Sequence, residues 1–307
     1  MAGFISPFAY AKSRRAKRKD ELRQLLMHLG RRDFEARHPS EVFAPVLVVM
    51  PSYQEADNIE HVLKAIPPEV DNISISTLVV IDGGDDETLE IVARVGAMCA
   101  VLPVNMGQGF ALRLGYELAA AHGARYVVTI DADGQNDPSE VSNLLIPLLS
   151  GQADVVIASR RIGFDEATDS ARRIGVSLFS WVISHLIRQR VTDTTNGFRA
   201  FRIEVLADMF LEQDQFQTAE VIVSAGFRGW RIADAPATWH ARTSGESKKV
   251  VGASAGVGQL GLFLGANVYF GIQYARVIVR TWRRERSKRQ VDTPQVDLRS
   301  LWTVGPK

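Results

Sequence analysis

Residues 126–135, YVVTIDADGQ, place two carboxylates directly behind a run of apolar residues. The run from Tyr126 to Ile130 is typical of a buried strand, and Asp131 and Asp133 follow it with one residue between them. Two like charges this close repel, and a divalent cation between them would compensate for the repulsion. The alternative interpretation is a polar strand-to-helix turn, in which an aspartate caps a helix beginning near Pro138.

The alternation of strand and helix continues on both sides of this stretch. Short apolar runs predict strands over residues 45–51, 76–82, 97–103, 124–130 and 153–159. Amphipathic segments between them predict helices over residues 55–66, 86–96, 109–123 and 137–151. Continuous apolar strands separated by such helices indicate an α/β fold, with a mostly parallel central sheet covered on both faces.

Polar residues follow four of these strands at the edge where such sheets bind ligands. They are PSYQE (51–55), IDGGDD (81–86), DADGQ (131–135) and SRR (159–161). The glycine-rich patterns of dinucleotide and P-loop sites are absent, and Ser52 lacks the context of a nucleophile elbow. An acid pair and arginines in one cleft suit a nucleoside diphosphate bound with Mg²⁺ or Mn²⁺.

Composition excludes several other classes of protein. The chain has 307 residues, of which 46% are hydrophobic and 23% charged, and its net charge of +1 does not indicate a nucleic-acid binder. The one cysteine, Cys99, lies in an apolar run, which argues against a disulfide framework or a zinc site and fits a reducing compartment. The N-terminus lacks the pattern of a secretory signal.

The two ends of the chain differ from the middle in charge. We expect a basic helical arm over residues 1–44, a catalytic domain over 45–249 and an apolar, then basic, helical segment over 250–307. The charge-free stretch 250–275 is long enough to cross a bilayer, but it can equally form a buried helical pair or lie in the interface. The basic runs 12–37 and 280–289 predict peripheral association with the cytoplasmic face of a membrane.

Several motifs occur in the order of a known family. They are VVMPSYQEADNI (48–59), VVIDGGDDET (79–88), NMGQGFALRLG (105–115), DADGQ (131–135), ASRR (158–161), DTTNGFRAFR (193–202), TAE (218–220) and RTSGESK (242–248). Together they resemble a family 2 glycosyltransferase of the GT-A fold, within the branch of polyprenyl-phosphate (dolichol-phosphate) sugar synthases. Gln54 and Gln108 replace the Asn and Lys that are usual in this family.

The resemblance implies roles for the residues at the strand ends. Asp131, Asp133 and Gln135 would hold Mg²⁺ or Mn²⁺, which leaves Asp137 as the helix cap. The residues implied in binding the nucleotide sugar are Pro51, Tyr53, Glu55, Asp82, Asp131 and, from a mobile loop hinged at Gly245, Arg242, Ser247 and Lys248. The alternative role for Glu55 is that of an acidic residue at the N-terminus of a helix, where the helix dipole favours a negative charge. In the second strand we take Asp82 to be the first acid of the family motif after a deletion, rather than Ile81 to be its replacement.

The resemblance also implies an acceptor site. Arg160, Arg173 and Ser177 match positions that hold the acceptor phosphate, and Arg173 and Ser177 share a helix face because they are four residues apart. Arg161, Arg172 and His240 are interpreted as solvated surface residues, with a metal contact as the alternative for His240.

Glu220 lies where relatives that use a hydroxyl acceptor place a general base, but the usual neighbouring Asp is missing. The residues assigned to catalysis are Asp133, Arg160 and Glu220. Of these, we expect Glu220 to be a structural or positioning residue rather than a base. A phosphate acceptor is already an anion at neutral pH and needs no base.

The activity implied is inverting, metal-dependent transfer of a hexose from UDP- or GDP-hexose to a polyprenyl or dolichyl phosphate at a membrane surface. The alternatives are a hydroxyl acceptor on a lipid, polysaccharide or small molecule, and an inactive GT-A scaffold. No nucleic-acid partner is expected.

Overall fold

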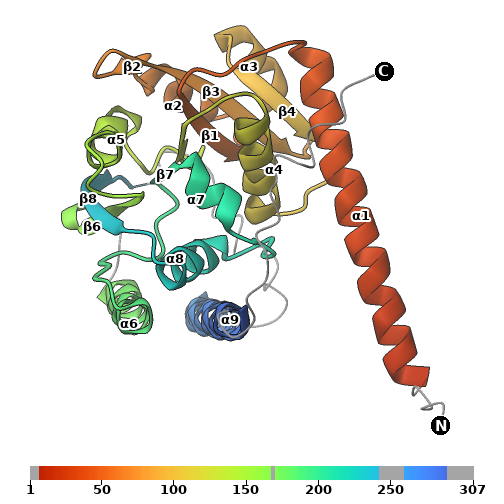
Figure 1. Cartoon of the computed structure of the whole chain (residues 1–307), viewed down its shortest axis with the longest axis vertical. Helices are drawn as coiled ribbons and strands as arrows, with labels where there is room; N and C mark the ends of the chain where they lie inside the picture. Colours follow the sequence, from red (N-terminus) through yellow and green to blue (C-terminus); the bar gives the residue numbers. More distant parts are fainter. Residues whose placement is uncertain (1–6, 167–169, 242–258, 289–307) are drawn as a thin grey trace.

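The computed structural model describes residues 7–166, 170–241 and 259–288. A mixed sheet forms its centre (Figure 1). Its strands are β1 (Val46–Ser52), β2 (Glu69–Val70), β3 (Ile73–Asp82), β4 (Met98–Leu102), β5 (Tyr126–Thr129), β6 (Val155–Asp165), β7 (Arg199–Arg202) and β8 (Ile232–Trp239). The five strands predicted from the sequence correspond to β1, β3, β4, β5 and β6 and are therefore confirmed.

The order of the strands explains where the parallel pattern is interrupted. β4, β3, β1 and β5 run parallel to one another, and the short β2 pairs antiparallel with the beginning of β3. β7 then lies between β5 and β6 and is antiparallel to both. β8 pairs parallel with β6. The expectation of a mostly parallel α/β sheet is confirmed, whereas β7 and β8 were not predicted.

Helices cover both faces of the sheet. One core lies under α2 (Ile59–Ala65), α3 (Thr88–Val95) and α5 (Val141–Leu149), with a short 3₁₀ turn η1 (Pro138–Glu140) before α5. The other core lies under α1 (Pro7–Arg37), α4 (Gln108–Ala121), α6 (Ser170–Ile187), α7 (Ile203–Asp208), α8 (Gln217–Phe227) and α9 (Gln259–Lys288). Successive residues of β1 alternate between the two cores, as the strand period requires.

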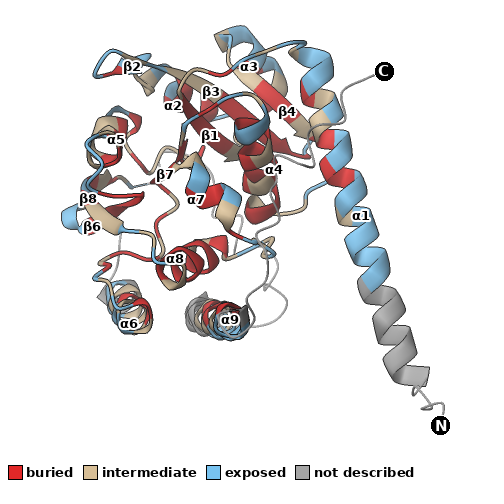
Figure 2. Cartoon of the chain, in the orientation of Figure 1, coloured by how far each residue is buried: buried red, intermediate tan, exposed pale blue. Residues whose placement is uncertain are grey.

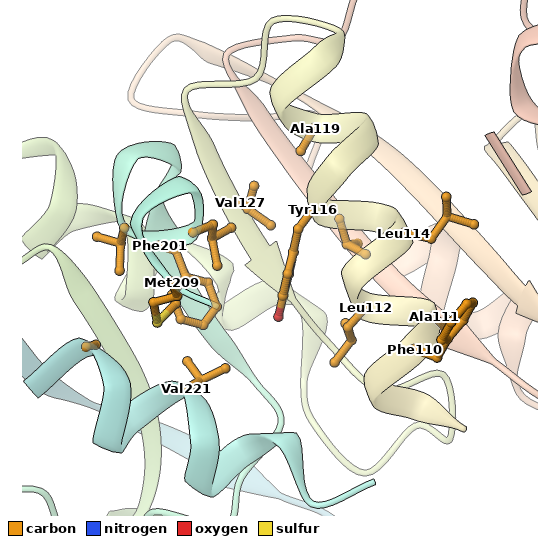
Figure 3. Close-up of a cluster of buried hydrophobic side chains, with 14 of the residues drawn as sticks. Phe110, Ala111, Leu112, Leu114, Tyr116, Ala119, Val127, Phe201, Met209 and Val221 are labelled. Atoms are coloured by element: carbon orange, nitrogen blue, oxygen red, sulfur yellow. The ribbon is translucent and has the colours of Figure 1, made fainter. Parts of the chain in front are cut away.

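The second core is centred on α4, as Figure 3 shows. Phe110, Leu114 and Tyr116 of this helix are almost fully buried, and the Tyr116 ring meets Phe201 of β7 edge-on at 6.1 Å between centroids. Burial raises the pKa of the Tyr116 hydroxyl well above its usual range. Gly115 leaves room for the sheet, because a Cβ there would lie 2.3 Å from Val49. This packing fixes the N-terminal end of α4 close to the carboxyl ends of the strands.

α1 covers the free edge of β4. Its C-terminal half buries Leu26 and Phe34, while its N-terminal part extends past the other elements (Figures 1 and 2). Asp33 accepts a hydrogen bond from the backbone N–H of Val101 (2.8 Å), and Nε2 of His38 accepts one from Cys99 (3.1 Å). These side chains take the place of a neighbouring strand and block further strand pairing at this edge.

α9 is joined to α8 by buried ion pairs. Arg284 contacts Glu220 of α8 at 2.9 Å, and Arg228 contacts Glu285 of α9 at 3.1 Å. Tyr274, Val277 and Ile278 of α9 belong to the same core as α1 and α4. The described parts of segments 1–44 and 250–307 therefore both contribute residues to this core.

None of the described helices is long and apolar enough to span a bilayer. Of the apolar stretch 250–275, residues 250–258 lie outside the described part, and the remainder forms the first half of α9.

Candidate donor and acceptor sites

Asp131 lies two residues beyond the end of β5 and is held from two sides. The side-chain amide of Gln108, the first residue of α4, donates to its Oδ1. A Cβ at Gly197 would lie 3.0 Å from both carboxylate oxygens of Asp131. The half-buried carboxylate therefore occupies space that only a glycine at position 197 leaves open.

Asp133 is connected to β8 through Gln135. The two polar atoms of the Gln135 side-chain amide lie 3.0 Å from Oδ2 of Asp133 and 3.2 Å from Nε1 of Trp239. The backbone adds a bond from the N–H of His240 to the carbonyl oxygen of Gln135 (2.7 Å). Asp137 caps the turn η1 by accepting from the N–H of Ser139 (2.9 Å), which confirms its predicted capping role.

The donor groups present here fit a hard divalent cation. Two carboxylates and one amide oxygen are ligands that Mg²⁺ and Mn²⁺ prefer, and no group of three or more His, Cys, Asp or Glu side chains forms a closed metal cage in the described ranges. Mg²⁺ is commonly held by one or two carboxylates together with substrate phosphates. Nearby, the buried side-chain amide of Asn136 has no hydrogen-bond partner among the described residues, as expected beside a polar ligand.

Asp82, at the end of β3, holds the loop that leads into α4. Its two carboxylate oxygens accept from the N–H groups of Met106 and Gly107, both at 2.7 Å. Burial raises the pKa of Asp82, although the two backbone donors oppose the shift. Ile81 is buried in the core, so Asp82 is the acid at this strand end. The loop that it fixes also carries Gln108, and Asp82 therefore helps to position Asp131.

The loops after β1 and β3 are tied together on the predicted nucleotide side. Asp86 accepts from the N–H of Ala56 (3.1 Å) and from the Thr88 hydroxyl (2.8 Å), and Thr88 in turn accepts from the N–H of Glu55 (3.2 Å). Pro51 and Tyr53 are half-buried at the end of β1. The fold thus brings Pro51, Tyr53, Glu55, Asp82, Asp131 and Asp133 to the same sheet edge.

A pocket of about 400 Å³ lies between the end of β6 and α6. It brings together the three predicted acceptor residues, and its lining consists of Arg160, Arg161, Phe164, Asp165, Arg173, Val176, Ser177 and Asp193. Arg161 donates to the hydroxyl of Ser177 (2.5 Å), and Arg173 donates to the carbonyl oxygen of Asp165 (3.2 Å). Arg161 is therefore part of the pocket wall rather than only a solvated surface residue.

Arg160 is buried and forms an ion pair inside the pocket wall. Its Nε and Nη2 donate to the two oxygens of Asp193 (2.6 and 2.9 Å). Burial alone would raise the pKa of Asp193, but the bonds from Arg160 outweigh it and hold the pKa below its usual value. The Arg160 guanidinium also lies over the Trp239 ring, 4.8 Å from its centroid. Trp239 therefore touches Arg160 on one side and Gln135 on the other, and links the two sites.

Glu220 is fully buried near the beginning of α8, and both of its carboxylate oxygens already accept hydrogen bonds. Its oxygens accept from the backbone N–H groups of Glu212 and Gln213, and Arg284 pairs with it at 2.9 Å. A general base needs a free lone pair directed at the acceptor. The contacts of Glu220 match the positioning role expected of it.

Three other predicted residues, Arg242, Ser247 and Lys248, lie outside the described residues, as does Gly245. His240 pairs with Glu166 at 3.1 Å and is partly exposed, in agreement with its interpretation as a surface residue.

Sequence similarity to known proteins identifies the family of this chain. Residues 47–210 match the family described as glycosyl transferase family 2. The chain is a family 2 glycosyltransferase. It is 32% identical over 206 residues to the dolichyl-phosphate hexose transferase of Haloferax volcanii, which covers 67% of this chain and 87% of that protein.

A second relative of this glycosyltransferase is the low-salt glycan biosynthesis hexosyltransferase Agl6 of the same organism, at 27% identity, 66% of this chain and 49% of Agl6. Among solved structures, glucosyl-3-phosphoglycerate synthase from Mycobacterium tuberculosis superposes with a TM-score of 0.58 at 21% identity, over 81% of each chain. That enzyme was crystallised with Mn²⁺, UDP and phosphoglyceric acid, and also with Mg²⁺ and UDP. The GT-A fold and the glycosyltransferase class are thereby established for this chain.

Sequence reasoning missed several residues of the glycosyltransferase site. Asp193 and Gly197 lie within DTTNGFRAFR, which was matched as a motif without a role for either residue. The ion pair of Asp193 and Arg160 cannot be read from the sequence, because the two residues are thirty-three positions apart. Trp239 lies outside every motif, and nothing in the sequence points to its contact with Gln135.

Proposed function

We propose that this glycosyltransferase moves a hexose from a nucleoside diphosphate sugar, bound with Mg²⁺ or Mn²⁺, to the phosphate of a polyprenyl lipid. Asp131, Asp133 and Gln135 would hold the cation, which supplies neutralisation of the diphosphate charge. Pro51, Tyr53 and Glu55 would contact the nucleoside, with Arg242, Ser247 and Lys248 as further donor ligands.

The observation that carries this proposal is the arginine-lined pocket joined to the acid pair. Arg160, Arg161 and Arg173 face it together with Asp165 and Asp193, which leaves the lining with a net positive charge. Arginine forks suit phosphate oxygens. Because Trp239 contacts both Arg160 and Gln135, a phosphate in the pocket would lie next to the donor sugar.

An anionic acceptor also fits the state of Glu220. In the proposed reaction a phosphate oxygen forms a bond to the anomeric carbon while the bond from that carbon to the nucleotide's β-phosphate oxygen breaks. The electron pair leaves with the diphosphate, and the anomeric carbon is inverted. No proton needs to be removed from the acceptor, which agrees with a Glu220 carboxylate already bonded to Arg284 and two backbone N–H groups.

The surface beside the pocket suits a lipid tail. α6 carries Arg173 and Ser177 and also exposes Ile174, Leu178 and Trp181, which are 69%, 57% and 60% exposed. Phe164 of the pocket lining is likewise 60% exposed. Aromatic and apolar residues next to arginines are typical of a surface that lies in the headgroup region of a bilayer.

A second candidate acceptor is a small phosphorylated molecule with a hydroxyl group. The solved relative with a similar fold was crystallised with phosphoglyceric acid. The arginines of the pocket would bind its phosphate as readily as that of a lipid. Its hydroxyl would, however, require a base other than the occupied Glu220.

The proposal is tested with Arg173→Gln, since Arg173 lines the pocket and is 58% exposed. Loss of a charge-assisted phosphate bond costs about 1.5–3 kcal/mol. KM for polyprenyl phosphate should therefore rise roughly 10- to 100-fold, while the affinity for the nucleotide sugar stays unchanged. The control is Arg190→Gln, an exposed arginine outside the pocket. Equal weakening of donor and acceptor, or turnover with 3-phosphoglycerate alone, would overturn the lipid acceptor.

A further inference from the structure

A larger pocket shares no lining residue with the acceptor pocket and meets the predicted donor residues at Met106, whose N–H is bonded to Asp82. Its volume is about 730 Å³, within the usual range of small-molecule sites. It is formed by α1, by the loop between α7 and α8, and by α9, and its lining consists of Lys19, Arg23, Met106, Glu212, Gln213, Asp214, Gln215, Phe216, Tyr269, Gln273, Arg276, Val277 and Arg280. All but Met106 lie outside residues 47–210, the part that matches the family.

The positive charges of this pocket are not balanced by its acids. Asp214 is paired with Arg113 at 2.6 Å and with Arg23, and Glu212 is paired with Arg284 at 2.9 Å. Arg113 and Arg284 are not part of the lining, so both acids are neutralised in part from outside the pocket. No ion pair or hydrogen bond joins the side chains of Lys19, Arg276 or Arg280 to any other described residue.

These three cations converge from two helices that are distant in the sequence. Arg276 and Arg280 are one helical turn apart on α9 and share a face, while Lys19 comes from α1. Like charges brought together in this way repel unless an anion lies between them. Gln213, Gln215, Gln273 and the Tyr269 hydroxyl add neutral hydrogen-bonding groups to the same lining.

The wall of the pocket also contains a strained residue. Phe216 has φ of 57°, in the left-handed region that bulky side chains rarely adopt. Such conformations persist where the surrounding structure enforces them, often at ligand sites. Here the preceding loop is held against α4, since the carbonyl oxygen of Asp214 accepts from the N–H of Gly109 (2.8 Å).

We propose that this pocket binds a phosphoanion, at a site separate from both the donor and the acceptor. Lys19, Arg276 and Arg280 provide the charge, and the glutamines provide the additional hydrogen bonds. The anion is either a soluble diphosphate or the phosphate of an anionic lipid headgroup.

The experiment measures both sources of the anion with the full-length protein. Inorganic pyrophosphate is titrated calorimetrically in the presence of EDTA, which keeps the metal-dependent donor site silent. Vesicles of phosphatidylglycerol and phosphatidylcholine are tested by flotation. The variant is Arg276→Gln/Arg280→Gln, and the matched control is Arg283→Gln, an exposed α9 arginine outside the pocket.

We expect the double variant to lose at least tenfold in affinity for pyrophosphate, for the vesicles or for both, while Arg283→Gln behaves as the wild type. Unchanged melting temperatures show that the variants are folded. Asp133→Ala and Arg173→Gln should still bind pyrophosphate; if either abolishes it, the ligand occupies the donor or acceptor site and the proposal is wrong. It is equally wrong if the double variant and Arg283→Gln are indistinguishable in both measurements.

Discussion

Individual residues around Asp131 set the geometry of the proposed cation site. Gly197 and Gln108 contribute no charge, yet they set the position of the carboxylate. Residues that orient metal ligands typically change metal affinity 10- to 100-fold when mutated. The site is therefore defined as much by these neighbours as by the two acids.

For Gly197→Ala we expect a folded protein with weakened metal-dependent binding of UDP or GDP. Gly197 does not have a positive φ, so alanine fits the backbone, but its Cβ would lie 3.0 Å from both oxygens of Asp131. The carboxylate must move, and affinity should fall at least roughly tenfold. Thermal shifts with nucleotide and Mn²⁺ measure this. Gly175→Ala, where a Cβ meets nothing within 4 Å, is the control and should bind as the wild type.

The buried pair of Asp193 and Arg160 makes a second prediction, on pH. Because the pKa of Asp193 is lower in the folded state, its ionised form stabilises the protein above the unfolded value near 3.8, and this contribution is lost as pH falls through the folded pKa. Asp193→Asn leaves Arg160 without its carboxylate and should cost about 3–5 kcal/mol at pH 7.

Urea unfolding of both proteins as a function of pH measures the difference. The gap between wild type and Asp193→Asn should be constant near neutrality and should narrow below about pH 4. A gap that stays the same down to pH 2 would mean that the ionised state of Asp193 does not stabilise the fold.

At the scale of elements, α1 acts as a cover for an exposed strand. Asp33 and His38 bond the N–H groups of Val101 and Cys99 on the free side of β4. A strand with unpaired backbone groups is a template for association with other chains. The N-terminal arm, for which the sequence suggested only a basic membrane contact, thus also has a structural role.

We therefore predict that Asp33→Ala destabilises the fold by about 1–3 kcal/mol, because the N–H of Val101 loses its acceptor. Glu35→Ala is the control: it lies on the same helix and is exposed, and alanine is the better helix former in both variants. Chemical denaturation of the two variants gives the comparison. Similar stabilities for both would show that water replaces Asp33 without cost.

The elements that the sequence predicted well are those with a strong local pattern. The strands before the acids are β-branched and apolar, so both their existence and the polar residues at their ends could be read directly. β7 has four residues and carries a buried arginine, Arg199, whose guanidinium is bonded to three backbone carbonyls. β8 contains the exposed Pro236, which is tolerated in an edge strand but weakens its pattern.

The residues of the site were likewise predictable only where they follow one another in a local sequence pattern. Asp131, Asp133 and Asp137 follow each other locally, so their roles could be separated from the sequence. Trp239 and Asp193 reach the site only because β7 and β8 place them there, and those strands had no clear signal.

The whole molecule presents one face suited to a membrane. In Figure 1, α6 and α9 are both seen end-on, on the side away from α2 and α3. α6 exposes Ile174, Leu178 and Trp181, and α9 exposes Tyr269, Ile272 and Val279 alongside Arg276 and Arg280. Each basic residue near anionic lipid contributes about 1 kcal/mol.

We predict that the protein binds vesicles containing phosphatidylglycerol and leaves them at about 1 M salt, where screening acts over a few ångströms. Leu178→Ser/Trp181→Ser should weaken flotation, whereas Ile146→Ser, an equally exposed apolar residue on α5, should not. Membrane binding that survives high salt and alkaline wash would contradict peripheral attachment. No binding at all would favour a soluble acceptor.

The contact between Glu220 and Arg284 has a consequence for how such chains evolve. Arg284 lies on α9, well beyond residue 210, where the match to the family ends. A lineage that kept this helix but lost Arg284 would have a buried carboxylate without its counter-ion, at a cost of about 3–5 kcal/mol. The acid would then have to be replaced or opened to solvent, where it regains the ability to accept a proton. Loss of Arg284 and a change in acceptor chemistry would therefore tend to be inherited together.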